Sequence, residues 1–255
     1  MPYAPFDLTG HVALVTGGNG GIGLGMAEAL AQAGAAVAVW GTNRAKNDAA
    51  VERLSRFGRP AVSLVCDVGD EAAVEAAMAA TAEALGKVDS CFANAGIGGS
   101  AKFTEMTADE WHRVLRVNLD GAFFTLRAAA RHMVERGEGG RLVTMSSLAS
   151  LQGQPRGEHY AASKGAMVSM AKALAVEFAR HGITANAILP GWVETDMTSD
   201  LFAWERFREN VLPRMPVGRW GRPEDFGGIA VYLASPASAF HTGDAILLDG
   251  GYSIF

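Results

Sequence analysis

The amino-acid sequence predicts a single α/β domain in which a parallel sheet of seven strands carries helices on both of its faces. The first observation behind this fold class is that short β-rich runs alternate with helical stretches along the whole chain. The second is that glycine ends several of those helical stretches, at Gly34, Gly58, Gly86 and Gly182. The third is that no linker, repeat or low-complexity segment divides the 255 residues, so we expect one domain over 1–255.

The expected elements follow from these patterns in chain order. The β-rich runs are HVALVT (11–16), AAVAVW (35–40), AVSLVC (61–66), VDSCFA (88–93), GRLVTMSS (140–147), ITANAIL (183–189) and AILLDGG (245–251). Helices are expected at 21–33, 44–58, 70–85, 108–136, 158–181 and 223–235. The stretch 108–136 opens with the capping-box pattern Thr107-Ala-Asp-Glu110. Residues 191–222 are rich in aromatic residues and proline, and we expect them to be irregular or weakly helical.

Composition and charge exclude several functional classes. The net charge of −5 and the pI of about 5.7 offer no basic surface for nucleic acid or for an anionic membrane. No apolar run is long enough to span a membrane, and the first residues do not resemble a signal peptide, so we expect a cytoplasmic protein. None of the histidines has a spacing typical of a metal site, and we expect no metal. Cys66 and Cys91 are expected to be reduced and packed.

The stretch TGGNGGIG (16–23) lies between the first expected strand and the first expected helix. In a doubly wound, Rossmann-type sheet this turn binds the pyrophosphate of a dinucleotide. Side chains must be absent there because the backbone approaches the phosphates closely, and the helix N-terminus adds N–H donors and partial positive charge. Gly17, Gly21 and Gly23 occupy these places, so the sequence predicts dinucleotide binding.

The glycine spacing T-G-x-x-x-G-x-G resembles that of the short-chain dehydrogenase/reductase family, in its single-domain branch with a Tyr-x-x-x-Lys motif and with a likeness to 3-oxoacyl reductases. The resemblance runs from about Leu8 to Tyr252. Other stretches that carry it are CDV (66–68), ANAG (93–96), Asn118, MSS (145–147), YAASK (160–164) and LPGWVETDM (189–197), with Ser147 thirteen positions before Tyr160. The resemblance implies the strand order 3-2-1-4-5-6-7. In that order the strands that carry Cys66 and Cys91 lie about 14 Å apart, too far for a disulfide.

The resemblance also implies a set of cofactor contacts, with no metal among them. They are Gly17, Asn19, Gly20, Gly21, Ile22, Gly23, Thr42, Asn43, Arg44, Asp67, Val68, Asn94, Ala95, Gly96, Tyr160, Lys164, Pro190, Gly191, Val193 and Thr195. Asp67 is the implied adenine contact, Lys164 the implied partner of the nicotinamide ribose, and the segment after Pro190 the implied neighbour of the nicotinamide.

Four residues are candidates for catalysis: Asn118, Ser147, Tyr160 and Lys164. Tyr160 and Lys164 lie one helical turn apart on one face. An ordinary tyrosine is a poor base at neutral pH, and a nearby cation favours the phenolate. We therefore expect Lys164 to lower the pKa of Tyr160, so that Tyr160 can act as the general acid or base. Ser147 would polarise the substrate carbonyl, although Ser146 is adjacent and only the resemblance selects between them. Asn118 either holds a water that relays protons from Lys164 or satisfies buried backbone groups, and the two roles are compatible.

NADP differs from NAD by a phosphate on the 2′ oxygen of the adenosine ribose. The residues that contact this oxygen are expected at the end of the second strand, VWGTNRAKN (39–47). Gly41 stands where the family's NAD-preferring members carry aspartate, and no acid occurs before Asp48. Arg44 could pair with a 2′-phosphate, with Thr42 and Asn43 donating hydrogen bonds. Against this, Thr42 and Gly20 replace basic residues that are common in NADP-preferring relatives, and Arg44 could be a solvated helix residue. The sequence favours NADP(H) slightly over NAD(H).

The sequence predicts an NAD(P)-dependent oxidoreductase that transfers hydride between nicotinamide and a carbonyl or secondary alcohol. The alternative is a non-catalytic dinucleotide-binding sensor or scaffold, although that protein would not need Ser147, Tyr160 and Lys164. The substrate is a small molecule, and a 3-oxoacyl thioester, a sugar or polyol, and a cyclic alcohol all remain open. The helix at 158–181 is apolar around most of its circumference, so one side covers the sheet and the other meets either a second subunit or loops of the same chain. The family resemblance implies assembly through this helix and its neighbour, so we expect a homo-oligomer, a tetramer or dimer.

The expected substrate side of the site lies around a lid at 191–215. Its apolar residues are Trp192, Phe202, Trp204, Phe207 and Met215, which serve either packing or substrate recognition. Ile97, Leu148, Leu151, Gln152 and His159 are further candidates to line the pocket. We expect His159 to be a surface residue of its helix rather than a second acid.

Overall fold

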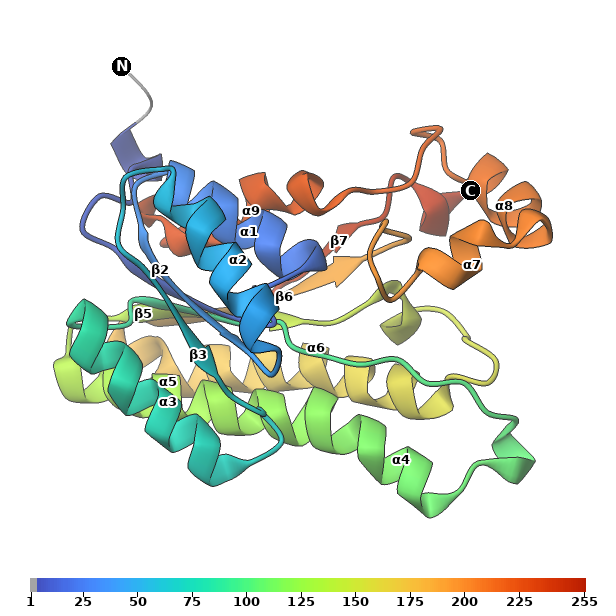
Figure 1. Cartoon of the computed structure of the whole chain (residues 1–255), viewed down its shortest axis with the longest axis horizontal. Coiled ribbons are helices and arrows are strands. Elements are labelled where there is room, and N and C mark those ends of the chain that lie inside the picture. Colours follow the sequence, from blue (N-terminus) through green and yellow to red (C-terminus); the bar gives the residue numbers. More distant parts are fainter. Residues whose placement is uncertain (1–3) are drawn as a thin grey trace.

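The computed structural model describes residues 4–255 and confirms the expected fold class and strand order (Figure 1). Its strands form one parallel sheet in the order β3-β2-β1-β4-β5-β6-β7. The strands are β1 (Val12–Thr16), β2 (Ala36–Gly41), β3 (Ala61–Val65), β4 (Ser90–Ala93), β5 (Gly140–Met145), β6 (Ile183–Pro190) and β7 (Ala245–Leu248). The order changes direction between β1 and β4, and there the carboxyl ends of the strands open a crevice for a ligand.

Helices cover both faces of the sheet, as Figure 1 shows. One face carries α1 (Gly21–Gln32), α2 (Arg44–Ser55) and α9 (Gly227–Ala234). The other carries α3 (Glu71–Leu85), α4 (Ala108–Leu115), α5 (Gly121–Arg136) and α6 (Glu158–Phe178). Because both faces are covered, the central strands are apolar on both sides: Leu14 and Trp40 pack toward α3 and α5, whereas Val15 and Val39 pack toward α1 and α9.

Two helical stretches differ in detail from the expectation. The stretch 108–136 is not one uniform α-helix, because a π-helical segment η3 (Arg116–Asp120) joins α4 to α5. A π-helical turn inside an α-helix is rare and occurs often at functional sites. The stretch 191–222, expected to be irregular or weakly helical, contains the short helices α7 (Ser199–Ala203) and α8 (Glu205–Val211). The remaining helices and the strands agree with the expected elements to within a few residues at their ends.

Both cysteines are free and buried, as expected; Cys66 directly follows β3 and Cys91 lies in β4, and β2 and β1 separate these two strands. Burial raises the pKa of the Cys66 thiol to about 11 and that of Cys91 to about 12. Within residues 4–255, no helix is both long and apolar enough to cross a membrane. The same residues contain no cluster of three or more histidine, cysteine or acidic side chains that could hold a metal ion.

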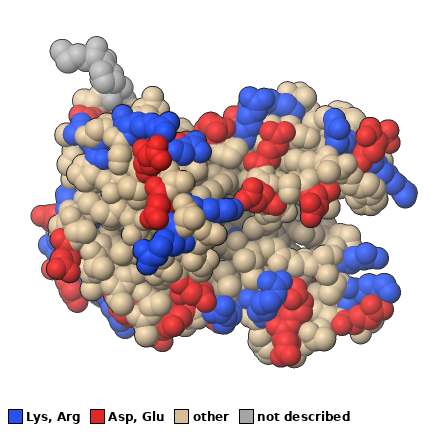
Figure 2. Space-filling view, in the orientation of Figure 1, with Lys and Arg blue, Asp and Glu red and all other residues tan. Residues whose placement is uncertain are grey.

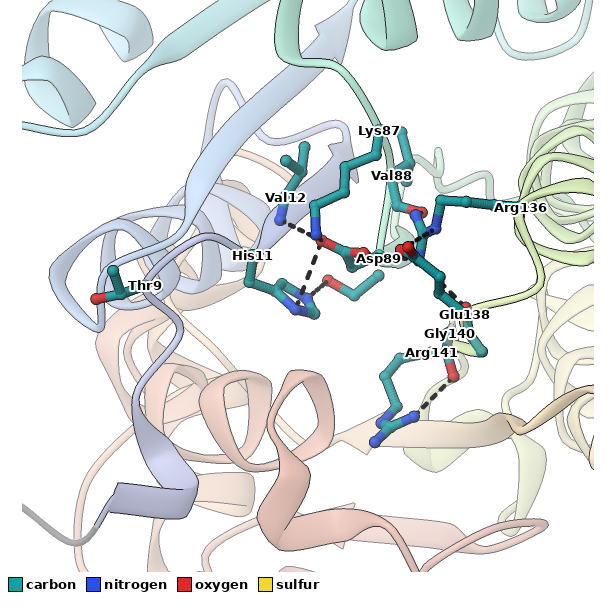
Figure 3. A network of polar contacts seen from close by, with 12 residues as sticks. Thr9, His11, Val12, Lys87, Val88, Asp89, Arg136, Glu138, Gly140 and Arg141 are labelled. Atoms are coloured by element: carbon teal, nitrogen blue, oxygen red, sulfur yellow. Dashed lines mark hydrogen bonds and ion pairs between the residues drawn. The ribbon is translucent and has the colours of Figure 1, made fainter.

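A polar network lies at the amino ends of β1, β4 and β5 (Figure 3). At its centre is Asp89, which accepts a hydrogen bond from the Val12 N–H at 2.8 Å and pairs with Lys87 at 3.1 Å and Arg136 at 2.7 Å. The His11 ring lies beside it, with Nε2 3.0 Å from the Ser90 hydroxyl. This network joins the strands at the edge of the sheet opposite the crevice, so it supports the fold and takes no part in the site.

Candidate active site

The glycine loop between β1 and α1 leaves the N-terminus of α1 open to a ligand. Gly17 has φ +62° and Gly21 has φ +50°, a region that L side chains rarely adopt. A Cβ on Gly23 would lie 2.4 Å from the Gly17 carbonyl oxygen, so only glycine allows the loop to fold so closely on itself. Gly20 caps α1 without a side-chain hydrogen bond, and a Cβ there would meet nothing within 4 Å. The open N–H groups of this helix end fit a pyrophosphate.

Asn94 and Thr16 join the glycine loop to the end of β4. The Asn94 amide nitrogen donates to the carbonyl oxygens of Thr16 at 2.9 Å and Gly17 at 3.3 Å. The Thr16 hydroxyl accepts in return from the backbone N–H groups of Asn94 and Ala95, both at 3.0 Å. The Asn94 side chain therefore supports the loop from below, a function for this residue that the sequence did not predict.

Two asparagines occupy the space beside Gly41, at the end of β2. A Cβ on Gly41 would lie 2.2 Å from the Asn19 amide nitrogen and 2.7 Å from the Asn47 amide oxygen. Asn47 is buried and donates to the carbonyl oxygens of Gly41 and Leu64, so its own oxygen accepts from Asn19, at 2.7 Å. A carboxylate at position 41 would clash with both amides. The neutral amide of Asn19 thus occupies the place that the side chain of an aspartate at position 41 would need.

The other residues expected at the 2′ position lie on the surface at the start of α2. Thr42, Asn43 and Arg44 are all exposed. The Asn43 oxygen caps α2 by accepting from the Lys46 N–H at 3.0 Å, which leaves its amide nitrogen as the remaining donor. Arg44 has no ion-pair partner among residues 4–255, so its guanidinium is free to meet an anion.

Ser147, Tyr160 and Lys164 come together at the carboxyl end of β5. The Ser147 hydroxyl lies near enough to the Tyr160 phenol to lower the pKa of that phenol. The Lys164 ammonium lies 5.5 Å from the centroid of the Tyr160 ring and donates to the Met145 carbonyl oxygen at 2.8 Å. Ser146 is buried and its hydroxyl donates to the Lys164 carbonyl oxygen at 2.7 Å. The structure thus separates the two serines, because only Ser147 meets the phenol.

The expected direction of the Tyr160 pKa is wrong for the free protein. Burial raises the pKa of Tyr160 above its ordinary value, and the hydrogen bond from Ser147 opposes that rise only in part. Burial also lowers the pKa of Lys164, to about 8. The expectation failed because it counted the charge of Lys164 and left out the cost of burying both groups. It is desolvation that dominates in this pocket.

Asn118 lies in the π-helical segment η3 and faces the end of β4. Its amide oxygen accepts from the Ile97 N–H at 2.8 Å, and its amide nitrogen donates to the Ile97 carbonyl at 3.0 Å and the Ser163 hydroxyl at 3.2 Å. A Cβ on Gly96 would lie 3.2 Å from the Asn118 oxygen and 3.4 Å from the Lys164 nitrogen. Asn118 therefore satisfies buried backbone groups, as one of its two expected roles required. The proton relay stays a prediction.

The remaining expected cofactor residues lie after β3, at the start of α1, and at the end of β6 and beyond it. The Asp67 carboxylate accepts from the Gly69 N–H at 2.9 Å and from Arg116 at 3.0 Å, so its orientation is set by two donors. The segment that follows β6 crosses over the glycine loop, since a Cβ on Gly21 would lie 3.2 Å from the Thr195 methyl group. Four others are packed beside these residues: Ile22 partly buried on α1, Val68 and Val193 buried, and Pro190 at the end of β6.

Most of the lid's apolar side chains pack against one another. Phe202 stacks on Trp220 with ring centroids 4.1 Å apart, and Trp192 meets Phe207 edge-on at 5.0 Å. Met215 is buried in the same cluster, whereas Trp204 is 56% exposed. Packing is therefore the main role of this set. Figure 2 shows the surface hollowed between the part around α7 and α8 and the part around α4, with positive and negative residues intermixed.

His159 is not the surface residue that the sequence suggested. Its side chain is completely buried, and its Nε2 lies 3.3 Å from a carboxylate oxygen of Glu110. The error arose because the apolar pattern of α6 gave no sign that α4 and the segment after β4 cover this turn. Among the other pocket candidates, Leu148 is buried, Leu151 is exposed, and Ile97 and Gln152 are partly buried.

Sequence reasoning missed several residues that shape the site. They are Thr16, Asn47, Glu110, Arg113 and Arg116. One of them carried a signal: Asn47 lies inside an expected helix, where asparagine is locally unfavourable, which is the argument that singled out Asn118. The others look like ordinary surface or turn residues, and only their distant partners give them a role.

Comparison with known proteins matches this fold and site over nearly the whole chain. A family model described as enoyl-(acyl carrier protein) reductase matches residues 17–253. Gluconate 5-dehydrogenase of Gluconobacter oxydans (strain 621H) is 38% identical over 98% of this chain and 97% of that enzyme. L-rhamnose 1-dehydrogenase (NAD(P)(+)) of Sphingomonas sp. (strain SKA58) is 39% identical over 96% of each chain. The crystal structure of a gluconate 5-dehydrogenase from Burkholderia cenocepacia J2315 in complex with NADP and tartrate has a TM-score of 0.94 at 38% identity, over 99% of this chain and 100% of that chain.

Proposed function

The chain belongs to the short-chain dehydrogenase/reductase family, and from that premise we propose that it interconverts a secondary alcohol and a carbonyl group on a sugar or sugar acid. It is an NAD(P)-dependent oxidoreductase of alcohols or carbonyls, like its relatives. The observation that carries the proposal is that Tyr160 has Lys164 5.5 Å from its ring centre and Ser147 beside its phenol, in a chain whose glycine loop leaves the start of α1 uncapped. A non-catalytic sensor would not need this arrangement.

We propose that the glycine loop and the N-terminus of α1 hold the pyrophosphate, with Asp67 and Val68 near the adenine and the segment after Pro190 near the nicotinamide. When bound, the nicotinamide supplies or accepts the hydride. The open helix end at Gly20 and the tight fold at Gly23 support this placement, because both fit a phosphate that approaches the backbone.

We propose that Tyr160 moves the proton of the reaction. In reduction the phenol donates its proton to the developing alkoxide oxygen, and in oxidation the phenolate accepts the proton of the alcohol. The Ser147 hydroxyl donates a hydrogen bond to the same oxygen of the substrate. Lys164, 5.5 Å from the centre of the Tyr160 ring, contacts the ribose of the nicotinamide, and Asn118 holds the Ile97 backbone and continues the path for protons toward solvent.

The preference for NADP(H) over NAD(H) is a further part of the proposal. No acid stands at the end of β2, and the Asn19 and Asn47 amides take the space beside Gly41. A neutral amide does not repel a 2′-phosphate, and Arg44, which has no ion-pair partner among the described residues, attracts one. The structurally similar gluconate 5-dehydrogenase that was crystallised with NADP supports the same preference.

We propose that the protein forms a homo-oligomer through the outward faces of α5 and α6. Val176 on α6 is 83% exposed and Phe123 on α5 is 43% exposed, and Ala173 is exposed on the same helix as Val176. Apolar residues at such positions favour contact with a second copy of the chain. A cytoplasmic location remains part of the proposal, supported by two buried cysteines that stay unbonded.

Absorbance near 340 nm tests the function directly. The protein is mixed with NADP+ or NAD+ and with gluconate, 2-dehydro-3-deoxygluconate, L-rhamnose, a polyol or a cyclic alcohol, and with NADPH or NADH and a 3-oxoacyl thioester. We expect turnover with at least one sugar or sugar acid and none with Tyr160→Phe. Turnover limited to the thioester or the cyclic alcohol would contradict the proposed substrate class. No turnover with any of them would leave the proposed activity without support.

A further inference from the structure

We propose that His159, Glu110 and Arg113 form a positioning unit that holds residues 97–101 against α6 and thereby sets the substrate pocket beside Tyr160. This inference rests on the proposed function, because it gives the three side chains a part in the same reaction. They act through other groups: His159 precedes Tyr160 in α6, and the segment 97–101 follows β4 on the substrate side. We call the three residues the His159 unit.

The His159 unit joins α6 to α4 through one carboxylate. The Glu110 oxygens accept from the Arg113 guanidinium at 2.7 and 2.9 Å, in a two-point contact along α4. One of these oxygens also lies 3.3 Å from the Nε2 of His159, whose side chain is completely buried. Arg113 thus orients the carboxylate, and the carboxylate orients the histidine ring.

The protonation of this unit follows from its partners. The hydrogen bonds from Arg113, with a smaller contribution from His159, hold the pKa of Glu110 at about 2, so the carboxylate is ionised and only accepts. The Nε2 of His159 must therefore carry the hydrogen that it shares with Glu110. Its Nδ1 is buried without a hydrogen-bond partner among residues 4–255. Only the Glu110 contact fixes the ring through a hydrogen bond.

The segment 97–101 lies directly on the His159 unit. Arg113 donates to the Gly98 carbonyl oxygen at 3.1 Å. A Cβ on Gly99 would lie 2.5 Å from both the Glu110 oxygen and the His159 Nε2, so the glycine backbone covers their contact. Asn118 already holds both backbone groups of Ile97. Three consecutive residues of the segment are therefore held by α4, η3 and α6.

The same segment lies against the lid, and in the proposal it is one wall of the substrate pocket. A Cβ on Gly98 would lie 3.8 Å from the Cγ of Met197, which belongs to the segment after β6. Gly98 and Gly99 have no side chains of their own, so the position of this wall depends on what holds their backbone. The His159 unit supplies that hold, from the turn of α6 that carries Tyr160.

A role in packing alone is a poor explanation of the buried histidine. A buried nitrogen without a partner reduces stability, and an apolar side chain of similar size would avoid that loss. In the proposal, this loss of stability is offset by function, because the His159 contact sets the distance between the Tyr160 phenol and the segment 97–101. A displacement of about 1 Å in such a distance can reduce turnover about a hundredfold.

Three variants test the proposal together with the unaltered protein. His159→Leu removes the donor to Glu110, whereas His159→Gln keeps an amide donor near the place of Nε2. His112→Leu makes the same change at an exposed histidine of α4 and serves as the matched control. Should His159→Leu fail to fold, Arg113→Met removes the contact with Gly98 from the exposed side of the unit.

Hydrogen exchange of the segment is the first measurement. The Ile97 N–H is bonded to Asn118 and the Ala101 N–H to the Arg156 carbonyl, so both amides report whether the segment stays in place. We expect exchange of the peptide that contains them to rise about tenfold in His159→Leu, to return toward normal in His159→Gln, and to stay normal in His112→Leu.

Kinetics with a sugar or sugar-acid substrate are the second measurement. We expect kcat of His159→Leu to fall about ten- to a hundredfold and the substrate KM to rise, while the dissociation constant for NADP(H) stays within about twofold. A lower melting temperature with unchanged exchange and unchanged kcat would mean that His159 only packs, and would overturn the proposal. If the unaltered protein has no activity, the proposed function fails, and exchange alone decides whether the unit holds the segment.

Discussion

Acid should destabilise this protein through one partly buried histidine, His11, before its carboxylates are protonated. Burial lowers the pKa of His11 from its ordinary value of 6.5 to about 4. The Asp89 charge opposes this shift, and the charges of Lys87, Arg141 and Arg136 add to it. Figure 3 shows why the Asp89 charge does not offset the effect of burial on the pKa of His11. The Asp89 carboxylate already contacts Lys87, Arg136 and the Val12 N–H, and the His11 Nδ1 lies 3.8 Å from it.

The sign and size follow from the two pKa values. Between pH 6.5 and pH 4 the unfolded chain binds a proton at His11 that the folded protein refuses, so stability falls as the pH falls through this range. A gap of about 2.5 between the two values corresponds to about 3 kcal/mol when the loss is complete, and to about 2 to 3 kcal/mol at pH 4.5. This is a large share of the ~5–15 kcal/mol that stabilises a typical domain.

Urea unfolding at pH 7.0, 5.5 and 4.5 measures the effect in the unaltered protein and in His11→Gln, with His112→Gln as the exposed control. Glutamine keeps a donor for the Ser90 hydroxyl and does not titrate. We expect the free energy of unfolding of His11→Gln to change less with pH than that of the unaltered protein, by about 2 kcal/mol at pH 4.5. Parallel curves for the two proteins would refute the assignment to His11.

Four substitutions test the proposed function and assembly. Tyr160→Phe should reduce turnover at least a thousandfold while NADP(H) still binds, because only the transferable proton is lost; substantial residual turnover would exclude the phenol as proton donor. Lys164→Ala should reduce both turnover and cofactor affinity, and an unchanged dissociation constant would exclude the ribose contact. Arg44→Ala should weaken NADP(H) about tenfold and leave NAD(H) unchanged, whereas equal losses, or a preference of the unaltered protein for NAD(H), would contradict the proposed 2′ recognition. Ala173→Glu should yield smaller species in light scattering, and an unaltered mass with an intact fold would argue against an interface at that position.

The sequence determined most of the fold because the relevant patterns are local. Short β-rich apolar runs report directly on the strands of a sheet covered on both faces, period-3.6 patterns report on the helices, and a glycine at a helix end reports on the left-handed turn that closes it. The same locality revealed the glycine loop and the Tyr160–Lys164 pair, since four residues span one turn of α6. Both features appear in the structure at the positions where the local patterns placed them.

Tertiary structure decided what depends on partners far away in the chain. It buried Ser146 against α6 and left Ser147 to meet Tyr160. It buried His159 under Glu110, 49 positions away, where the pattern of α6 suggested a surface residue.

The space beside Gly41 and the direction of the Tyr160 pKa were likewise matters of packing. The sequence showed that Gly41 is not an acid, but only the fold brings Asn19 and Asn47, 28 positions apart, into the space beside it. The sequence also placed the Lys164 cation near the Tyr160 phenol, but it did not show how strongly burial shifts the pKa values of these two groups. Periodicity reports which way a side chain points along its own element; burial and polar contacts depend on which elements pack against it, and that is settled only when the whole chain has folded.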